Sequence, residues 1–172
     1  MRNRKNKGFT LMDALLWFAV FGVMVAVLYT KFSTGMDEAK TKNEVDAMSN
    51  AAAGIKRVMQ NANVTENNAA LNATAINAGV VLRPWVIAAN GIDITNSWGG
   101  NVTITNVSAQ NYSIQTQAVP RRSCIGILTS GGDFASALVN AGNNVNRTDI
   151  TSVAANQNCG NDANTITLTY IK

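Results

Sequence analysis

The chain of 172 residues contains no histidine, only two cysteines and only two prolines. The missing histidine removes the commonest general base and the commonest metal ligand of proteins. The chain also has no Cys-x-x-Cys pair, no Gly-x-Ser-x-Gly motif and no glycine-rich phosphate loop, and its acidic residues are scattered. We therefore expect no enzymatic activity, no bound metal and no cofactor.

A basic surface is also missing once the first eight residues are set aside. The net charge of +4 comes from fourteen Lys and Arg against ten Asp and Glu. Four of the cations precede Gly8 (Arg2, Arg4, Lys5 and Lys7). The rest of the chain therefore carries ten positive and ten negative side chains. Nucleic-acid binding through a phosphate-neutralising patch is not expected for that remainder.

A long apolar run follows these cations. It extends from Phe9 to Tyr29, and Thr10 and Asp13 are its polar interruptions. As a helix the run would be about 30 Å long, which is enough to cross the hydrocarbon core of a bilayer. The preceding cations predict that the N-terminus stays in the cytoplasm and that the rest of the chain lies outside.

Three interpretations of this run compete. An ordinary secretory signal ends in a small-residue cleavage site, and the sequence Tyr29-Thr30-Lys31-Phe32 offers none. A plain membrane anchor leaves Asp13 unexplained, because a carboxylate in the apolar zone costs about 2.5–3.5 kcal/mol and is by default functional.

The third interpretation rests on a family. A basic leader, Gly8, then Phe9-Thr10-Leu11, the acidic Asp13 and an apolar helix resemble the N-terminus of a type IV prepilin. The resemblance implies that a prepilin peptidase in the membrane cuts after Gly8 and N-methylates Phe9. It also implies that Asp13, where the family usually has Glu, pairs with the terminal amine of a neighbouring subunit. Gly22 lies where type IV pilins commonly carry glycine, which permits close helix approach.

The helical pattern continues beyond the apolar run but becomes amphipathic. Charged residues predict one solvated face (Lys31, Asp37, Glu38, Lys40, Lys42, Glu44 and Asp46). Apolar residues spaced by three and four predict the opposite, buried face (Phe32, Met36, Val45, Met48, Ala52, Ile55 and Met59). We predict one helix from about Thr10 to about Gln60; two helices broken near Ser33 to Gly35 are the alternative.

The rest of the chain predicts an antiparallel sheet with short helices. Alternating residues indicate two paired strands at 101–105 and 111–118 and a central or tying strand at 164–172, with Ile166, Leu168 and Tyr170 on one face. Short helices are expected near 69–77 and 120–128 and at 131–141, where Gly142 would end the helix. A short strand is expected near 150–153, and Pro84 argues against a central strand at 80–87.

The sequence Asn96-Ser97-Trp98-Gly99-Gly100 predicts a turn with positive backbone angles, beneath which the tryptophan can bury. It resembles the Asn-Pro-Phe/Trp-Gly-Gly turn that opens the sheet in type IVb major pilins of bundle-forming and conjugative thin pili. Ser97 replaces the proline of that pattern.

Cys124 and Cys159 lie in the part of the chain predicted to be outside the membrane. Because the periplasm oxidises such pairs, we expect a disulfide; two free buried thiols are the alternative. A disulfide near the C-terminus is similar to the D-region of type IV pilins, and type II secretion pseudopilins usually lack it.

Taken together, we expect an α+β protein with the type IV pilin fold and a C-terminal disulfide region. The expected parts are a leader (1–8), a transmembrane and filament-core helix (9–30) and a head (31–172). The head comprises an amphipathic helix half (31–60), an αβ-loop (61–97) and the sheet and disulfide region (98–172).

The expected function is that of a major pilin, polymerised through its N-terminal helix into a filament for adhesion, cell aggregation or conjugation. The resemblance implies three partners: further copies of the chain in a helical filament, the prepilin peptidase and the assembly machinery of the inner membrane. The precursor would reside in the inner membrane of a Gram-negative bacterium and the pilus outside the cell. A minor pilin or tip adhesin and a type II secretion pseudopilin remain alternatives.

Overall fold

A single helix, α1 (Leu11–Asn61), makes up 51 residues of the chain in the computed structural model, which describes residues 11–61, 69–130, 132–142 and 144–172. The helical backbone continues through Ser33 to Gly35, so the predicted single helix is confirmed and the broken alternative is wrong. Thr10, the predicted start, lies outside the described residues. The chain divides into two compact units, of which the first ends at Asp37 and the second is Glu38–Lys172.

The second unit contains an antiparallel sheet of eight strands, in the order β2-β3-β4-β5-β8-β6-β7 with β1 paired to β4. The strands are β1 (Ala69–Ala70), β2 (Val86–Ile87), β3 (Ile94–Thr95), β4 (Asn101–Asn106), β5 (Asn111–Val119), β6 (Ser136–Val139), β7 (Val145–Asn146) and β8 (Asn164–Ile171). Its helical segments besides α1 are α2 (Asn72–Asn77), α3 (Arg121–Thr129), the 3₁₀ turn η1 (Arg147–Asp149) and α4 (Ser152–Asn158). The predicted α+β class is therefore confirmed.

The three longest strands lie next to one another in the middle of the sheet. β4 and β5 form the predicted pair, with Val102 opposite Thr116 and Ile104 opposite Ile114. The C-terminal strand β8 lies between β5 and β6, and its even-numbered residues from 164 to 170 are buried while the odd-numbered ones are partly exposed. The regular alternation in the sequence thus marked a central strand whose buried face meets the core.

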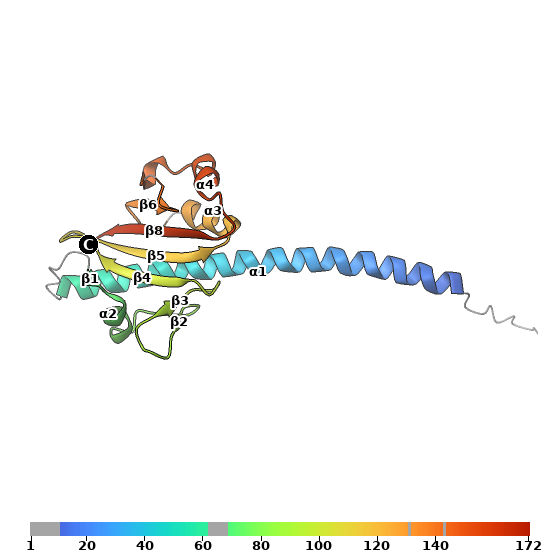
Figure 1. Ribbon diagram of the computed structural model, residues 1–172, viewed down its shortest axis with the longest axis horizontal. Helices are drawn as coiled ribbons and strands as arrows, with labels where there is room; N and C mark the ends of the chain where they lie inside the picture. The colour runs from blue at the N-terminus through green and yellow to red at the C-terminus, as the bar shows by residue number, and fades with distance from the viewer. Residues whose placement is uncertain (1–10, 62–68, 131, 143) are drawn as a thin grey trace, which may run out of the picture. The chain divides into compact units, whose positions relative to one another are not determined.

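The part of α1 that belongs to the second unit covers one face of this sheet (Figure 1). Its predicted apolar stripe is largely buried, with Met48, Ala52 and Ile55 in the core. Met36 is 49% exposed, and the side chain of Phe32 lies outside the described residues. Glu44, which was assigned to the solvated face, is fully buried, so that assignment is wrong.

The predicted helix at 131–141 is wrong, because residues 136–139 form strand β6 instead. They pair antiparallel with β8, with Ser136 opposite Thr169 and Val139 opposite Ile166. β5 pairs with one edge of β8, and the backbone N–H and C=O groups of the other edge still require hydrogen-bond partners. The chain then turns through Asn140 and Ala141, both with positive φ, so Gly142 ends no helix.

The predicted strand at 150–153 is also wrong, because Ser152 begins α4. Thr151 has extended backbone angles, and its hydroxyl accepts a hydrogen bond from the backbone N–H of Ala154 at 3.1 Å. This arrangement is an N-cap, which satisfies a donor that the first turn of a helix leaves open. The helix predicted near 120–128 is confirmed as α3, which follows Pro120. The helix predicted near 69–77 is confirmed for α2 alone, because Ala69 and Ala70 form β1.

The predicted turn after β3 is confirmed, and its two glycines serve different purposes. Gly99 has a φ of +79°, a conformation that side chains disfavour. Gly100 allows close packing, because a Cβ built there would lie 1.9 Å from the carbonyl oxygen of Gln117 on β5. Trp98 is half-buried against the core, as expected.

We predict that Gly100→Ala lowers the free energy of unfolding by about 1–3 kcal/mol, because the methyl group collides with backbone that cannot move independently. Urea unfolding of the full-length protein in detergent micelles, followed by tryptophan fluorescence, measures the change. Gly160→Ala is the matched control, since its Cβ would have 3.8 Å of clearance. Equal effects of the two substitutions would contradict this account of Gly100.

Candidate functional site

The first part of α1 presents an exposed apolar surface. The segment Leu11–Tyr29 is long and apolar enough to cross a membrane, and no part of it is buried. All of its large apolar side chains are at least 42% exposed (Leu11, Met12, Leu15, Leu16, Trp17, Phe18, Val20, Phe21, Val23, Met24, Val25, Val27, Leu28 and Tyr29). Exposure of such a surface to water is unfavourable, so the surface is expected to contact lipid or other protein chains.

Two of the residues predicted to act in assembly lie on this segment. Asp13 is in the first turn of α1 as described, and its side chain is exposed. Gly22 has open space around it, because a Cβ built there would meet no atom within 4 Å. Nine residues along a helix correspond to about 180° of rotation, so Asp13 and Gly22 face opposite sides of α1. Gly8 and Phe9, the predicted processing residues, lie outside the described residues.

A second constellation, centred on Glu44, holds α1 to the head. Its Oε1 accepts a hydrogen bond from Trp85 Nε1 at 2.7 Å, and its Oε2 accepts from Oγ and the backbone N–H of Ser97 at 3.2 and 3.4 Å. Trp85 comes directly before β2, and Ser97 comes two residues after β3. One carboxylate therefore joins α1 to both ends of the β2–β3 hairpin.

The electrostatics of this junction are those of a carboxylate among neutral donors. Burial raises the pKa of Glu44 above its ordinary value of 4.5, and the hydrogen bonds from Trp85 and Ser97 offset part of the rise. No described cation lies within ion-pair distance of it. The junction thus depends on hydrogen bonds for its geometry, and removing a donor leaves buried polar atoms without partners.

Asn96 ties the neighbouring turn to β5. Its Oδ1 accepts hydrogen bonds from the backbone N–H groups of Trp98 and Gly100, each at 2.9 Å. Its Nδ2 donates to Thr116 Oγ1 at 2.7 Å and to the carbonyl oxygen of Gln117 at 2.6 Å. Asn96 is buried and uses both ends of its amide, so the asparagine that opens this turn organises it.

The expected disulfide joins Cys124 and Cys159, and the alternative of two free thiols is wrong. Cys124 lies in α3, Cys159 follows α4, and both are fully buried. With a sequence separation of 35 residues, the chain-entropy model gives a stabilisation of roughly 3.5–4 kcal/mol. The bond fixes the two small helices to each other beside the sheet.

A model of the family described as PilS N terminal, a type IV pilin-related family, matches residues 37–171. The chain belongs to the PilS N-terminal family. The match covers the second unit and excludes the apolar segment, so it is independent of the N-terminal motif. No curated protein gives a significant match.

Membership in a pilin-related family indicates a structural rather than a catalytic protein. Among the residues that the structure describes, no group of three or more His, Cys, Asp or Glu side chains could hold a metal ion. The main features of this PilS-family chain are accordingly the exposed apolar segment Leu11–Tyr29 and a head crosslinked by the disulfide between Cys124 and Cys159.

Sequence reasoning missed the Glu44 junction, although the spacing contains a signal. Glu44 precedes Met48 by four residues and Ala51 by seven, which places it on the buried face of α1. A carboxylate on an apolar stripe calls for donors, and the indole of Trp85 is one of the three in the chain. The individual partners could not be read from spacing, because they come from 41 and 53 residues further along.

We predict that the stability of the wild-type head, relative to Glu44→Gln, falls as pH rises from about 4 to about 7. The folded state holds the Glu44 proton more tightly than the unfolded state does, so Glu44 contributes most below its ordinary pKa and less as pH passes its raised folded pKa. Glutamine does not titrate and removes this slope. Thermal unfolding of both forms across this range gives the difference.

Glu38→Gln is the matched control on the same helix, because Glu38 is exposed. It should leave the pH dependence of the wild type unchanged. A wild-type stability that rises with pH relative to Glu44→Gln would show that the junction favours the ionised carboxylate, contrary to this prediction.

Proposed function

We propose that this chain is the structural subunit of a type IV pilus, made as a membrane-anchored precursor and polymerised through the first part of α1. The observation that carries the proposal is the wholly exposed apolar segment Leu11–Tyr29 in a chain whose second unit belongs to a pilin-related family. A lipid bilayer covers that segment before assembly, and the same segments of neighbouring subunits cover it afterwards. The subunit would begin in the inner membrane of a Gram-negative bacterium and end on the cell surface.

The energetics favour a polymer over a free subunit outside the membrane. Each large apolar side chain exposed to water costs about 1.5–3 kcal/mol relative to burial, so the whole segment costs roughly 20 kcal/mol or more. Transfer from lipid into a bundle of like helices changes little of this, because lipid is equally apolar. Extraction from the membrane therefore needs assembly machinery, whereas the finished filament holds together by itself.

Two roles within this function are proposed for single residues. Cleavage by a prepilin peptidase after Gly8 would leave Phe9 with a new, methylated amine. Asp13 of one subunit would meet that amine of the next, because a carboxylate is tolerated in apolar surroundings when a cation pairs with it. Gly22 would let neighbouring helices approach closely where no side chain intervenes.

Features of the head support the type IVb subclass and a pilin rather than a secretion pseudopilin, and the proposed role is that of the major subunit. The Asn96–Gly100 turn has an asparagine that organises it and a glycine that packs on β5, consistent with the type IVb pattern. The disulfide between Cys124 and Cys159 encloses β6, β7 and α4, consistent with a pilin D-region rather than with a secretion pseudopilin. The filament would serve adhesion, cell aggregation or conjugation.

We predict that Gly8→Ala leaves the precursor uncut and in the membrane fraction, because the added methyl group blocks the peptidase site. Immunoblots of membrane and surface-sheared fractions from cells expressing either form measure the distribution. Normal filaments from Gly8→Ala cells would refute processing at this residue.

We predict that Asp13→Asn is processed but assembles poorly, because the neighbouring amine is then buried without a counter-charge. The expected loss of about 3–5 kcal/mol per contact leaves few or no filaments. Electron microscopy of sheared material, with the N-terminus checked by mass spectrometry, measures both steps.

Asp13→Glu is the matched control, since it keeps the charge and adds one methylene group. It should be processed and should form filaments. Filament yields that are equal for Asp13→Asn and the wild type would remove Asp13 from the assembly step.

A further inference from the structure

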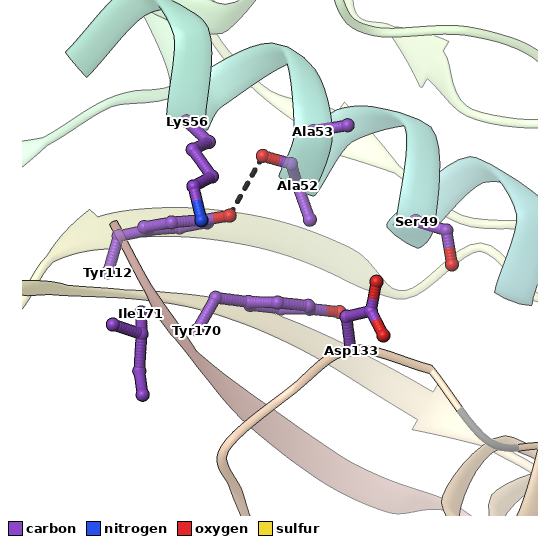
Figure 2. Close-up of a pocket in the computed structure, with 8 residues that line it drawn as sticks. All are labelled: Ser49, Ala52, Ala53, Lys56, Tyr112, Asp133, Tyr170 and Ile171. Atoms are coloured by element: carbon purple, nitrogen blue, oxygen red, sulfur yellow. Dashed lines mark hydrogen bonds between the residues drawn. The ribbon is translucent and has the colours of Figure 1, made fainter. Parts of the chain in front are cut away.

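A small cleft lies between the second part of α1 and the sheet (Figure 2). Its volume is about 180 Å³. One wall comes from α1, and the other comes from β5, β8 and the segment before β6 (Ser49, Ala52, Ala53 and Lys56; Tyr112, Tyr170, Ile171 and Asp133). Small residues on α1 leave the space open, and polar groups converge on it.

Two stacked tyrosines form its base. Tyr112 and Tyr170 are opposite each other on β5 and β8, with ring centroids 5.3 Å apart and ring planes inclined by 10°. The Tyr112 hydroxyl donates to the carbonyl oxygen of Ala52 at 2.8 Å. The Tyr170 side chain is only 5% exposed, yet its hydroxyl forms no hydrogen bond with any described residue. Because this hydroxyl is accessible from the cleft and has no partner among the described residues, it can bind a ligand there.

Both phenols are protonated at neutral pH, and burial moves their pKa values still further above it. Burial raises the pKa of Tyr112 to about 12. It also raises the pKa of Tyr170, to which Tyr112 and Asp133 add a smaller charge effect. The Tyr170 hydroxyl therefore offers both a donor and an acceptor to a bound molecule.

Opposite charges flank these hydroxyls. Lys56 and Asp133 both line the cleft, and Figure 2 shows the Asp133 carboxylate next to the Tyr170 hydroxyl. Both side chains are exposed, and neither forms an ion pair with any described residue. The cleft thus has a positive end and a negative end that do not neutralise each other directly.

We propose that this cleft binds a small zwitterion of amino-acid size. Its ammonium group lies against Asp133 and the Tyr170 hydroxyl, and its carboxylate lies against Lys56. A ligand with one charge satisfies one end and leaves the other uncompensated, whereas a zwitterion satisfies both. This binding function is separate from filament assembly and does not depend on the first unit.

The test uses the full-length protein in detergent micelles and four small probes: γ-aminobutyrate, butyrate and butylamine, which share a four-carbon chain, and uncharged glucose. Saturation-transfer NMR titrations measure the affinity of each. We expect saturable binding of γ-aminobutyrate and at least roughly tenfold weaker binding of butyrate and butylamine, which each lose one charge-assisted contact. Comparable affinity for glucose, or no saturable binding of γ-aminobutyrate, would overturn the proposal.

Substitutions in the cleft test whether the probe binds there. Lys56→Gln and Asp133→Asn should each weaken γ-aminobutyrate binding roughly tenfold. Lys42→Gln and Asp149→Asn remove exposed charges outside the cleft and should change nothing. Because Lys56 and Asp133 are exposed, circular dichroism should show native folding for both variants. Binding that survives both cleft substitutions would overturn the proposal.

Tyr170→Phe removes one oxygen atom and keeps the aromatic stack. It should weaken γ-aminobutyrate binding about fivefold while the chain keeps its fold. Unchanged affinity would show that the hydroxyl contacts no ligand, contrary to the proposed placement of the ammonium group.

Discussion

The constraint on which this protein depends is the exposed apolar surface of the first part of α1. Leu11–Tyr29 exposes all of its large side chains, including Trp17, Phe18 and Phe21. A surface of this kind is compatible with a bilayer or with a bundle of identical helices, but not with water. In the proposed function, this one physical property would account both for a precursor held in the membrane and for a subunit that exists outside only in a polymer.

In the head, the sheet and its loops pack on the second part of the same helix. Met48, Ala52 and Ile55 of α1 belong to the same buried apolar cluster as residues of the sheet. Glu44 fixes the position of the β2–β3 hairpin on α1 but adds little to the free energy of unfolding, because a buried carboxylate bound by neutral donors gains little net stability. Its three hydrogen bonds fix where the β2–β3 hairpin begins and ends. The disulfide fixes α3 and α4 to each other near β8 and β6 (Figure 1).

Much of this fold could be predicted from local patterns. The single long helix, the β4–β5 pair and the central β8 each carry a clean period of 3.6 or 2, and the Asn96–Gly100 turn carries its own residue signature. The helix predicted at 131–141 failed because partners distant in sequence decide the outcome, whereas the strand predicted at 150–153 failed because the local N-cap at Thr151 was missed. Residues 136–139 have helix-like spacing but form β6, because the open edge of β8 supplies hydrogen-bond partners.

The candidate sites divide in the same way. Asp13 and Gly22 stand out by sequence because each is unusual within an apolar run. Glu44 looked like one charge among several, because only the folded head brings Trp85 and Ser97 to it. The cleft between Lys56 and Asp133 was equally invisible, since its two ends are far apart in the chain and come near each other only when α1 packs on the sheet and β6 pairs with β8.

The most direct test of the central claim is mass spectrometry of the N-terminus of wild-type protein sheared from the cell surface, combined with electron microscopy of the same material. We expect filaments whose subunits begin at a methylated Phe9. Sheared protein that retains Met1, or that is monomeric with the apolar segment intact, would contradict the account.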